Sequence, residues 1–231
     1  MDKKTFSIGD AVSFGWETMT KNVWFFVLVM LILWIASGIP SAAQSGYGYL
    51  PGAAAATLGF IFALIGLVVA VFVNMAQVTI GLDFCDQKPA DYGDLVSNYQ
   101  KFWDVLIGSI LYFLIVLAGL ILLIIPGIYW AIRYHFFAYL IIDKDMKPVE
   151  AIKRSGQLTR GVWWHLFVLA LAMFGITLIG VILCGVGLLF TTPIVLVSIA
   201  YVYRTLQAAT PAAMPVQPPP VPVSESPAAQ A

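Results

Sequence analysis

Long uncharged apolar runs constrain this sequence more than any other feature. The run from Ala53 to Ile80 contains no charged residue, and further apolar runs precede and follow it. A helix of about 20 apolar residues crosses the ~30 Å hydrocarbon core of a bilayer, and this run exceeds that length. Only 10% of the 231 residues are charged, whereas a soluble domain has about 25%. The sequence therefore predicts an integral membrane protein.

We predict one all-α membrane domain over residues 1–207, with six transmembrane helices arranged as three hairpins. The expected spans are residues 23–39, 53–80, 102–125, 128–142, 163–184 and 186–203. Pro126 and Gly127 are expected to break the chain between the third and fourth spans. Residues 208–231 are rich in Ala and Pro and hold few large apolar groups, so we expect a disordered cytoplasmic tail there.

A polar segment precedes each expected hairpin, at residues 7–20, 83–101 and 143–161. In these segments apolar residues recur at three- and four-residue steps, which predicts amphipathic helices lying in the membrane interface. Each segment ends with a basic residue followed closely by a Trp, as in Lys101-Phe102-Trp103. This recurrence is consistent with a threefold internal repeat. It is equally consistent with the basic residue and the Trp that any interfacial helix carries where it leads into a transmembrane helix.

The positive charges predict the orientation of the chain. Every Lys and Arg except Arg133 falls in a segment that six crossings put on one side of the membrane. The connections at 40–52, 126–127 and 184–187 contain no Lys or Arg. Because cytoplasmic loops carry the excess of Lys and Arg, that side is predicted to be the cytoplasm. Both termini are expected there, in a cell (inner) membrane.

Arg133 is the only basic residue within an apolar run. An unpaired charge deep in a membrane is costly, so such a residue is a candidate functional site. In one interpretation its side chain snorkels outward past Tyr129 and Trp130, or bonds to helix-end carbonyls. In the other it contacts a ligand or lipid headgroup or lines a conduction path. A helical rise of ~1.5 Å per residue from Gly127 puts its Cα roughly 9 Å from the outer end of the span.

Asn74, Gln77 and His135 are the other candidate ligand contacts. The two amides belong to a stripe of mostly small residues along the second span, formed by Gly59, Ala63, Gly66, Ala70, Asn74, Gln77 and Gly81. Hydrogen bonding between helices is the favoured role for these amides, and a polar pathway is the alternative. His135 and His165 lie on different spans without an HxxxH motif, so no metal site is predicted.

Lys153, Arg154 and Arg160 form a predicted basic surface on the cytoplasmic side. No catalytic triad, P-loop or cofactor motif is present, and zero net charge gives no case for nucleic acid. We therefore expect a non-catalytic scaffold or accessory subunit, without a cofactor, that contacts membrane lipids or a protein partner. One alternative is a small transporter or channel in which Arg133 and the polar stripe line a cavity. An intramembrane enzyme is less favoured because paired acid and base residues are missing.

The sequence IPGIYWAIRYHFFAYLIID, followed by EAIKRSGQLTRGVWW, resembles a group of poorly characterised prokaryotic membrane proteins. This group includes the membrane domain attached to some glycerophosphoryl diester phosphodiesterases. The similarity extends over about residues 91–206. The matching positions are Pro126, Gly127, Arg133, Arg154, Ser155, Leu158, Thr159 and Gly161. The resemblance implies an integral membrane fold. It does not carry over the enzymatic activity, because this chain contains no phosphodiesterase barrel.

Overall fold

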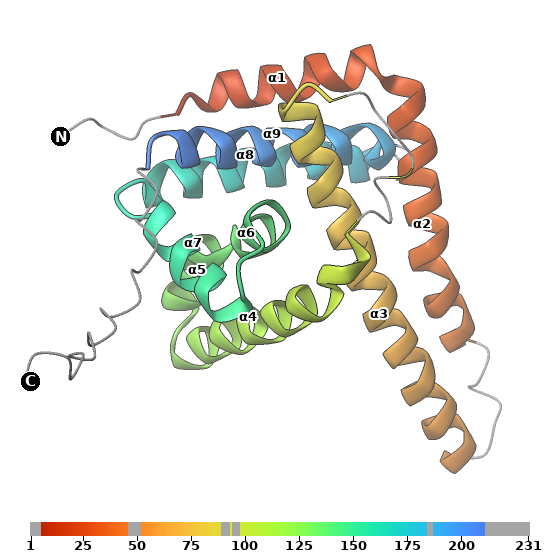
Figure 1. Ribbon diagram of the computed structural model, residues 1–231. Coiled ribbons are helices and arrows are strands. Elements are labelled where there is room, and N and C mark those ends of the chain that lie inside the picture. Colours follow the sequence, from red (N-terminus) through yellow and green to blue (C-terminus); the bar gives the residue numbers. More distant parts are fainter. Residues whose placement is uncertain (1–5, 46–51, 89–92, 94–97, 184–186, 211–231) are drawn as a thin grey trace, which may run out of the picture.

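The computed structural model describes residues 6–45, 52–88, 93, 98–183 and 187–210, and every regular element in these ranges is helical (Figure 1). This confirms the predicted all-α class. The predicted tail beyond residue 210, and residues 89–92 and 94–97 of the second predicted amphipathic segment, lie outside the described residues. The α-helices are α1 Ile8–Lys21, α2 Val23–Ser45, α3 Gly52–Cys85, α4 Phe102–Leu122, α5 Ile124–Tyr134, α6 Phe137–Lys144, α7 Pro148–Leu158, α8 Trp163–Ile182 and α9 Leu188–Ala208, with a 3-10 turn at Tyr99–Lys101 before α4.

Four helical stretches among the described residues are long and apolar enough to cross a membrane. They are α3, α8, α9 and the stretch Tyr99–Leu122 that contains α4. A fifth candidate is the pair Ile8–Lys21 and Val23–Gly38, whose axes meet at 94°. Asn22 stands at this bend, and its side-chain amide donates to the Thr18 carbonyl at 3.1 Å. These long apolar helices support a multi-span membrane protein, whereas six separate spans do not emerge from helix length and composition.

The predicted fourth span, residues 128–142, is divided between two short helices. α5 has 11 residues and α6 has 8, so neither alone crosses a bilayer. The predicted break at Pro126 and Gly127 is displaced to Leu123, whose backbone is extended with φ −168° and ψ 149°. Pro126 lies in the first turn of α5, where the missing amide hydrogen costs no intrahelical bond. The proline therefore starts a helix here and does not end one.

α4 and α5 approach so closely that two glycines meet at the contact. A Cβ at Gly119 would lie 2.8 Å from the Cα of Gly127, and a Cβ at Gly127 would lie 2.6 Å from Leu120. Farther along the pair, the Tyr112 hydroxyl donates to the Ala131 carbonyl at 3.0 Å. Small residues thus allow these two backbones to pack, as expected for helices in lipid.

α6 occupies the centre of the molecule, with α3, α4 and α7 around it (Figure 1). All of its residues from Phe137 to Ile142 are buried. α1 lies along α9, and a second apolar cluster forms where α2 packs on α3 and α9. Elsewhere many large apolar side chains face outward, for example Phe113, Leu171 and Ile182. An exterior of this kind suits lipid contact.

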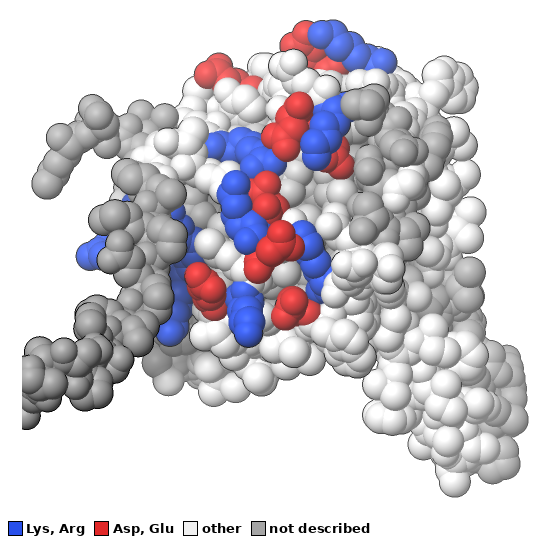
Figure 2. All heavy atoms as spheres, viewed as in Figure 1, with Lys and Arg blue, Asp and Glu red and all other residues white. Residues whose placement is uncertain are grey.

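Ion pairs join helix ends on one side of the molecule. The Arg204 guanidinium of α9 contacts Asp86, just after α3, at 2.6 Å and Asp143 of α6 at 2.8 Å. Lys101, just before α4, pairs with Asp145 at 2.7 Å. Figure 2 shows Lys, Arg, Asp and Glu side chains gathered on the face toward the viewer. The ends of α3, α6 and α9 and the start of α4 therefore share one charged end.

The α4–α5 contact yields a stability prediction. Gly127→Ala should lower the free energy of unfolding in detergent by about 1–3 kcal/mol, because the new methyl group overlaps Leu120 and neither helix can move away freely. Gly175→Ala is the matched control, since no atom lies within 4 Å of a Cβ at that position of α8. Thermal melts of the two variants compare them. An equal effect of both substitutions would contradict the close helix contact.

Candidate ligand-binding cavity

A cavity of about 330 Å³ lies among α3, α4, α6 and α9. Its polar lining comes from separate elements: two amides from α3, two hydroxyls from α4, one imidazole from the break after α5 and one hydroxyl from α9. These residues are Asn74, Gln77, Ser109, Tyr112, His135 and Thr192. Apolar side chains of α6 and α9 complete the wall. Three of the four ligand contacts predicted from sequence therefore meet in one space.

Most of these polar side chains have no hydrogen-bond partner among the described residues. Tyr112 donates to the Ala131 carbonyl. No such bond joins Asn74, Gln77, Ser109, His135 or Thr192 to any described residue. Inside a membrane an unsatisfied polar group costs several kcal/mol. The cavity is therefore suited to water or to a hydrogen-bonding ligand.

The cavity is well inside the helical layer. At ~1.5 Å per residue, Asn74 lies roughly 16 Å along α3 from Cys85, and Ser109 roughly 10 Å along α4 from Phe102. Both reference residues are at the charged end described above. These depths fall in the half of a ~30 Å hydrocarbon layer next to that end and reach its middle.

Hydrogen bonding between helices, the role that the sequence favoured for the two amides of α3, is not seen among the described residues. Close packing of α3 against α9 occurs at Gly81, where a Cβ would lie 3.1 Å from both Ala200 and Leu196. Asn74 and Gln77, one to two turns away, line the cavity and make no hydrogen bond to another described helix. The small residue at the end of the stripe acts in helix packing, and the amides act in the cavity wall.

The break between α5 and α6 brings His135 to the cavity. Hydrogen bonds from α7 hold this break. The Ser155 hydroxyl accepts from the Phe136 amide at 3.2 Å and donates to the Arg133 carbonyl at 3.1 Å. The Thr159 hydroxyl also donates to the Arg133 carbonyl, at 3.1 Å. These bonds satisfy backbone groups that a continuous helix would have paired. The His135 ring is thereby set between two cavities.

Two further cavities adjoin the central one. The first, about 290 Å³, shares Tyr112 and His135 with it and has an otherwise mainly apolar lining from α5, α8 and α9. The second, about 130 Å³, lies between α2, α3 and α9 and shares Gln77 and Thr192. His135 on one side and Gln77 on the other therefore stand at the junctions of a row of three cavities.

Arg133 does not line the central cavity. Its Nη1 donates to the Tyr129 hydroxyl at 2.6 Å, and the guanidinium lies over the rings of Tyr129 and Tyr134. Its Nε is 3.4 Å from the position of a Cβ on Gly156 of α7. The guanidinium thus contacts Tyr129, one turn toward the start of α5, and α7, which folds back onto the end of α5. Outward snorkelling and a ligand or headgroup contact both stay predictions.

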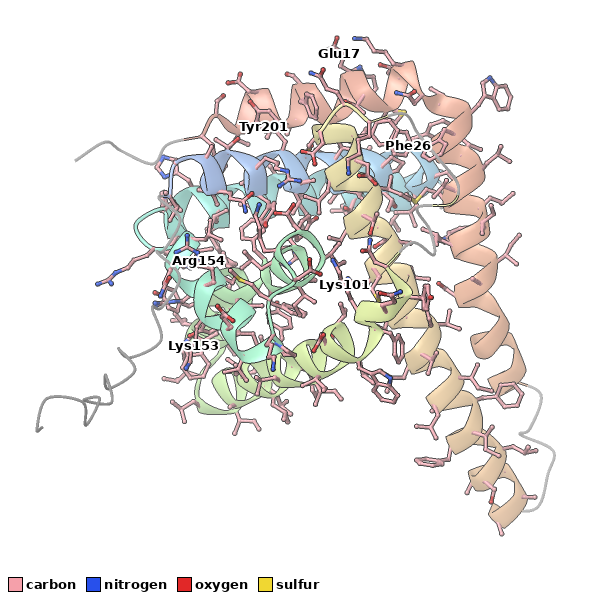
Figure 3. The ribbon with its side chains drawn as sticks, viewed as in Figure 1. Glu17, Phe26, Lys101, Lys153, Arg154 and Tyr201 are labelled. Atoms are coloured by element: carbon pink, nitrogen blue, oxygen red, sulfur yellow. The ribbon has the colours of Figure 1, made fainter. Side chains whose placement is uncertain are left out.

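The predicted basic surface lies on and just after α7. Lys153 and Arg160 are exposed, and Arg154 is half-buried and donates to Gln157 at 3.1 Å. Figure 3 shows Lys153 and Arg154 among the side chains of α7, away from α2 and α3. In the described part of the chain, no cluster of three or more His, Cys, Asp or Glu side chains is arranged to hold a metal ion.

Ser109, Tyr112 and Thr192 are cavity residues that the sequence did not single out. Each is a lone hydroxyl within an apolar helix, and such residues commonly bond back to their own helix. The available signal was their polarity inside predicted spans. That signal does not say which face of the helix meets a cavity.

The chain belongs to the family described as protein of unknown function (DUF975), whose model matches residues 53–210. It is similar to the uncharacterized protein Rv2560 of Mycobacterium tuberculosis, with 25% identity over 227 aligned residues, covering 87% of this chain and 69% of that protein. The uncharacterized protein Mb2590 of Mycobacterium bovis matches with the same identity and coverage. No solved structure matches. The similarity to the membrane domain of glycerophosphoryl diester phosphodiesterases thus stays a resemblance in sequence pattern.

A polar cavity at this depth predicts selective thiol accessibility. In a chain with Cys85→Ala and Cys184→Ala, Ser109→Cys should react with a small hydrophilic methanethiosulfonate reagent in native membranes, because water reaches the cavity. Ile110→Cys is the matched control. This neighbouring residue is exposed on the apolar exterior and does not line the cavity, so its thiol should stay unreacted. Equal reaction rates at the two positions would show that the cavity is dry.

Proposed function

We propose that this chain is a non-catalytic, multi-span membrane protein that binds a small, uncharged, hydrogen-bonding molecule in the central cavity and lets it cross the membrane. The observation that carries this proposal is the set of five polar side chains that meet there without a hydrogen-bond partner among the described residues. Amides, hydroxyls and an imidazole supply both donors and acceptors. Sites of this kind orient a ligand by a few polar groups within a largely apolar wall.

The lining favours an uncharged solute over an ion. None of the described side chains around the cavity belongs to Lys, Arg, Asp or Glu. A permanently charged ligand would lose its hydration there without meeting an opposite charge, which costs several kcal/mol. A neutral solute with hydroxyl or amide groups loses less and can bond to the wall.

The surroundings of the cavity support a passage through the bundle. The adjoining cavities extend the space toward α2 on one side and, with a mainly apolar lining, toward α8 on the other. Toward the charged end, the Tyr139 ring packs on Tyr203 with centroids 5.2 Å apart, and Tyr203 donates to Asp143 at 3.0 Å. Beyond this pair is a polar pocket of about 360 Å³ around Arg204. In this proposal the two tyrosines close the cavity from that pocket.

The proposed topology has six crossings in three hairpins, with both termini in the cytoplasm of a cell membrane. α5 and α6 together form the fourth crossing because they run back along the whole of α4. Gly127 meets Gly119, Ala131 bonds to Tyr112, and the Ile142 carbonyl accepts from Lys101 at 2.6 Å. α1 and α7 would then lie at the cytoplasmic interface, where their polar faces stay hydrated.

Thiol labelling with an impermeant maleimide tests this topology in the cysteine-free background. Leu123→Cys, at the exposed corner between α4 and α5, should be labelled in intact cells. Lys153→Cys, exposed on α7, should be labelled only after the membrane is opened. Ser155 is unsuitable for this purpose because it is fully buried. Labelling of Lys153→Cys from outside would overturn the orientation.

A scaffold or accessory role is the second candidate, and a specific feature favours it. The charged end presents a dense surface of Lys, Arg, Asp and Glu (Figure 2), and α7 adds the exposed Lys153 and Arg160 beside it. Charged surfaces of this kind steer association with a partner or with anionic lipid. The cavity would then serve to bind a structural lipid or water, and no solute would cross.

Solute flux separates the two candidates. Proteoliposomes should admit glycerol faster than protein-free liposomes in stopped-flow light scattering. Asn74→Leu with Gln77→Leu should reduce the added flux about tenfold or more, because the solute loses two hydrogen-bonding side chains. Gln157→Leu, an exposed amide on α7, is the control and should keep the flux. Flux equal to that of empty liposomes, for glycerol and for urea, would contradict the transport proposal and leave the scaffold.

A further inference from the structure

Arg133 is a cation without a counter-ion. Among the described residues it forms no ion pair, and its one side-chain hydrogen bond goes to the neutral Tyr129 hydroxyl. Its Nε is buried without a partner against α7. Its Nη2 also has no acceptor among these residues and, unlike Nε, is not fully enclosed. The Nη2 group is therefore left open for an acceptor that the described chain does not supply, whereas Nε is enclosed.

The surroundings place this cation at a membrane interface. The end of α7 is fastened to Arg133 through Ser155 and Thr159. The Tyr129 ring is 5.5 Å from that of Trp163, the first residue of α8. The next residue, Trp164, is 60% exposed. Tyr and Trp collect at the level of lipid headgroups, so these rings favour a contact between the Arg133 guanidinium and lipid on the side of α7.

Two more unpaired cations flank the end of α7. Lys153 and Arg160 are exposed and form no ion pair with any described residue. Arg160 directly follows Thr159, whose hydroxyl contacts the Arg133 backbone. Three positive charges therefore belong to α5, α7 and the segment that joins α7 to α8. This local excess contrasts with the charged end, where Arg204 and Lys101 are matched by carboxylates.

We propose that the junction of α5, α7 and α8 binds the phosphate group of an anionic phospholipid in the leaflet next to α7. The open Nη2 of Arg133 would donate to a phosphate oxygen, while Tyr129 holds the planar guanidinium in place, which the flexible Lys ammonium reproduces less well. Arg160 and Lys153 add attraction from the rim. This site is separate from the central cavity, so the lipid proposal and the transport proposal can be tested independently.

The adjacent surface favours a lipid over a soluble anion. Trp164, Val168 and Leu171 lie at four- and three-residue steps along α8 and are all exposed. Such spacing forms one apolar stripe on a helix, which begins beside the basic residues. An acyl chain can follow this stripe while the headgroup stays on the cations. A free phosphate ion would use only the headgroup part of the surface.

Native mass spectrometry of the purified protein tests the site. The protein is mixed with equal amounts of phosphatidylglycerol and phosphatidylcholine of the same acyl length. The intact protein should retain phosphatidylglycerol in preference. Arg133→Gln should reduce that preference about tenfold, and Arg133→Lys less, because Lys keeps the charge but loses the planar group that Tyr129 holds in place. Lys21→Gln, which removes one charge from a remote exposed ion pair with Glu17, should leave the preference unchanged.

Additional variants and a phosphate control distinguish a lipid site from a folding defect or a soluble-anion site. If Arg133→Gln does not fold, Arg160→Gln replaces it, since Arg160 is exposed and its loss should weaken retention about two- to threefold. An unchanged lipid preference in both variants would overturn the proposal, as would an equal loss in Lys21→Gln. Thermal stabilisation by inorganic phosphate equal to that by phosphatidylglycerol would show a soluble-anion site and exclude the lipid. Glycerol flux in the same variants should not change, which separates failure here from failure of the transport proposal.

Discussion

The architecture depends on the fastening of α7 to the break between α5 and α6. Backbone groups freed inside a membrane must find partners, and here the Ser155 and Thr159 hydroxyls supply them at Arg133 and Phe136. Gly156 allows the close approach, since a Cβ there would lie 3.1 Å from Tyr134. With the break held open in this way, a short helix can turn inward. α6 becomes the buried centre of the bundle, and the other helices pack around it.

The hydrogen bonds between α7 and the break also separate the Arg133 cation from the neutral polar side chains of the cavity. On one side of the break His135 faces the cavity, where neutral side chains from α3, α4 and α9 converge. On the other side the Arg133 guanidinium meets α7 and lies over the Tyr129 ring, which packs near Trp163 at the start of α8. A continuous helix would also place residues 133 and 135 on nearly opposite faces, about 200° apart. The break adds the turn that lets α6 pack inward, with Arg133 against α7 and His135 lining the cavity.

Sequence patterns predicted the helical class and most helix positions because long apolar runs and polar turns are strong local signals. They misplaced the break near Pro126, because a proline is compatible with the first turn of a helix as well as with its end. They identified Asn74, Gln77 and His135 as candidates, since polar residues stand out in apolar runs. They did not bring them together, or add Ser109 and Thr192, because convergence of separate helices is a tertiary property. For Arg133, counting residues along a straight helix could not reveal that α7 folds back onto α5.

We propose that the break between α5 and α6, bonded to Ser155 and Thr159, keeps a water-filled polar cavity inside the helical bundle. An electron cryo-microscopy map of the protein in lipid nanodiscs, at a resolution that shows water, tests it most directly. We expect density for water or a bound ligand within hydrogen-bonding distance of Asn74, Gln77 and His135. The Ser155 hydroxyl should be hydrogen-bonded to the Arg133 carbonyl. A continuous helix through residues 124–144, with Asn74 and Gln77 hydrogen-bonded directly to neighbouring helices and no density between them, would contradict it.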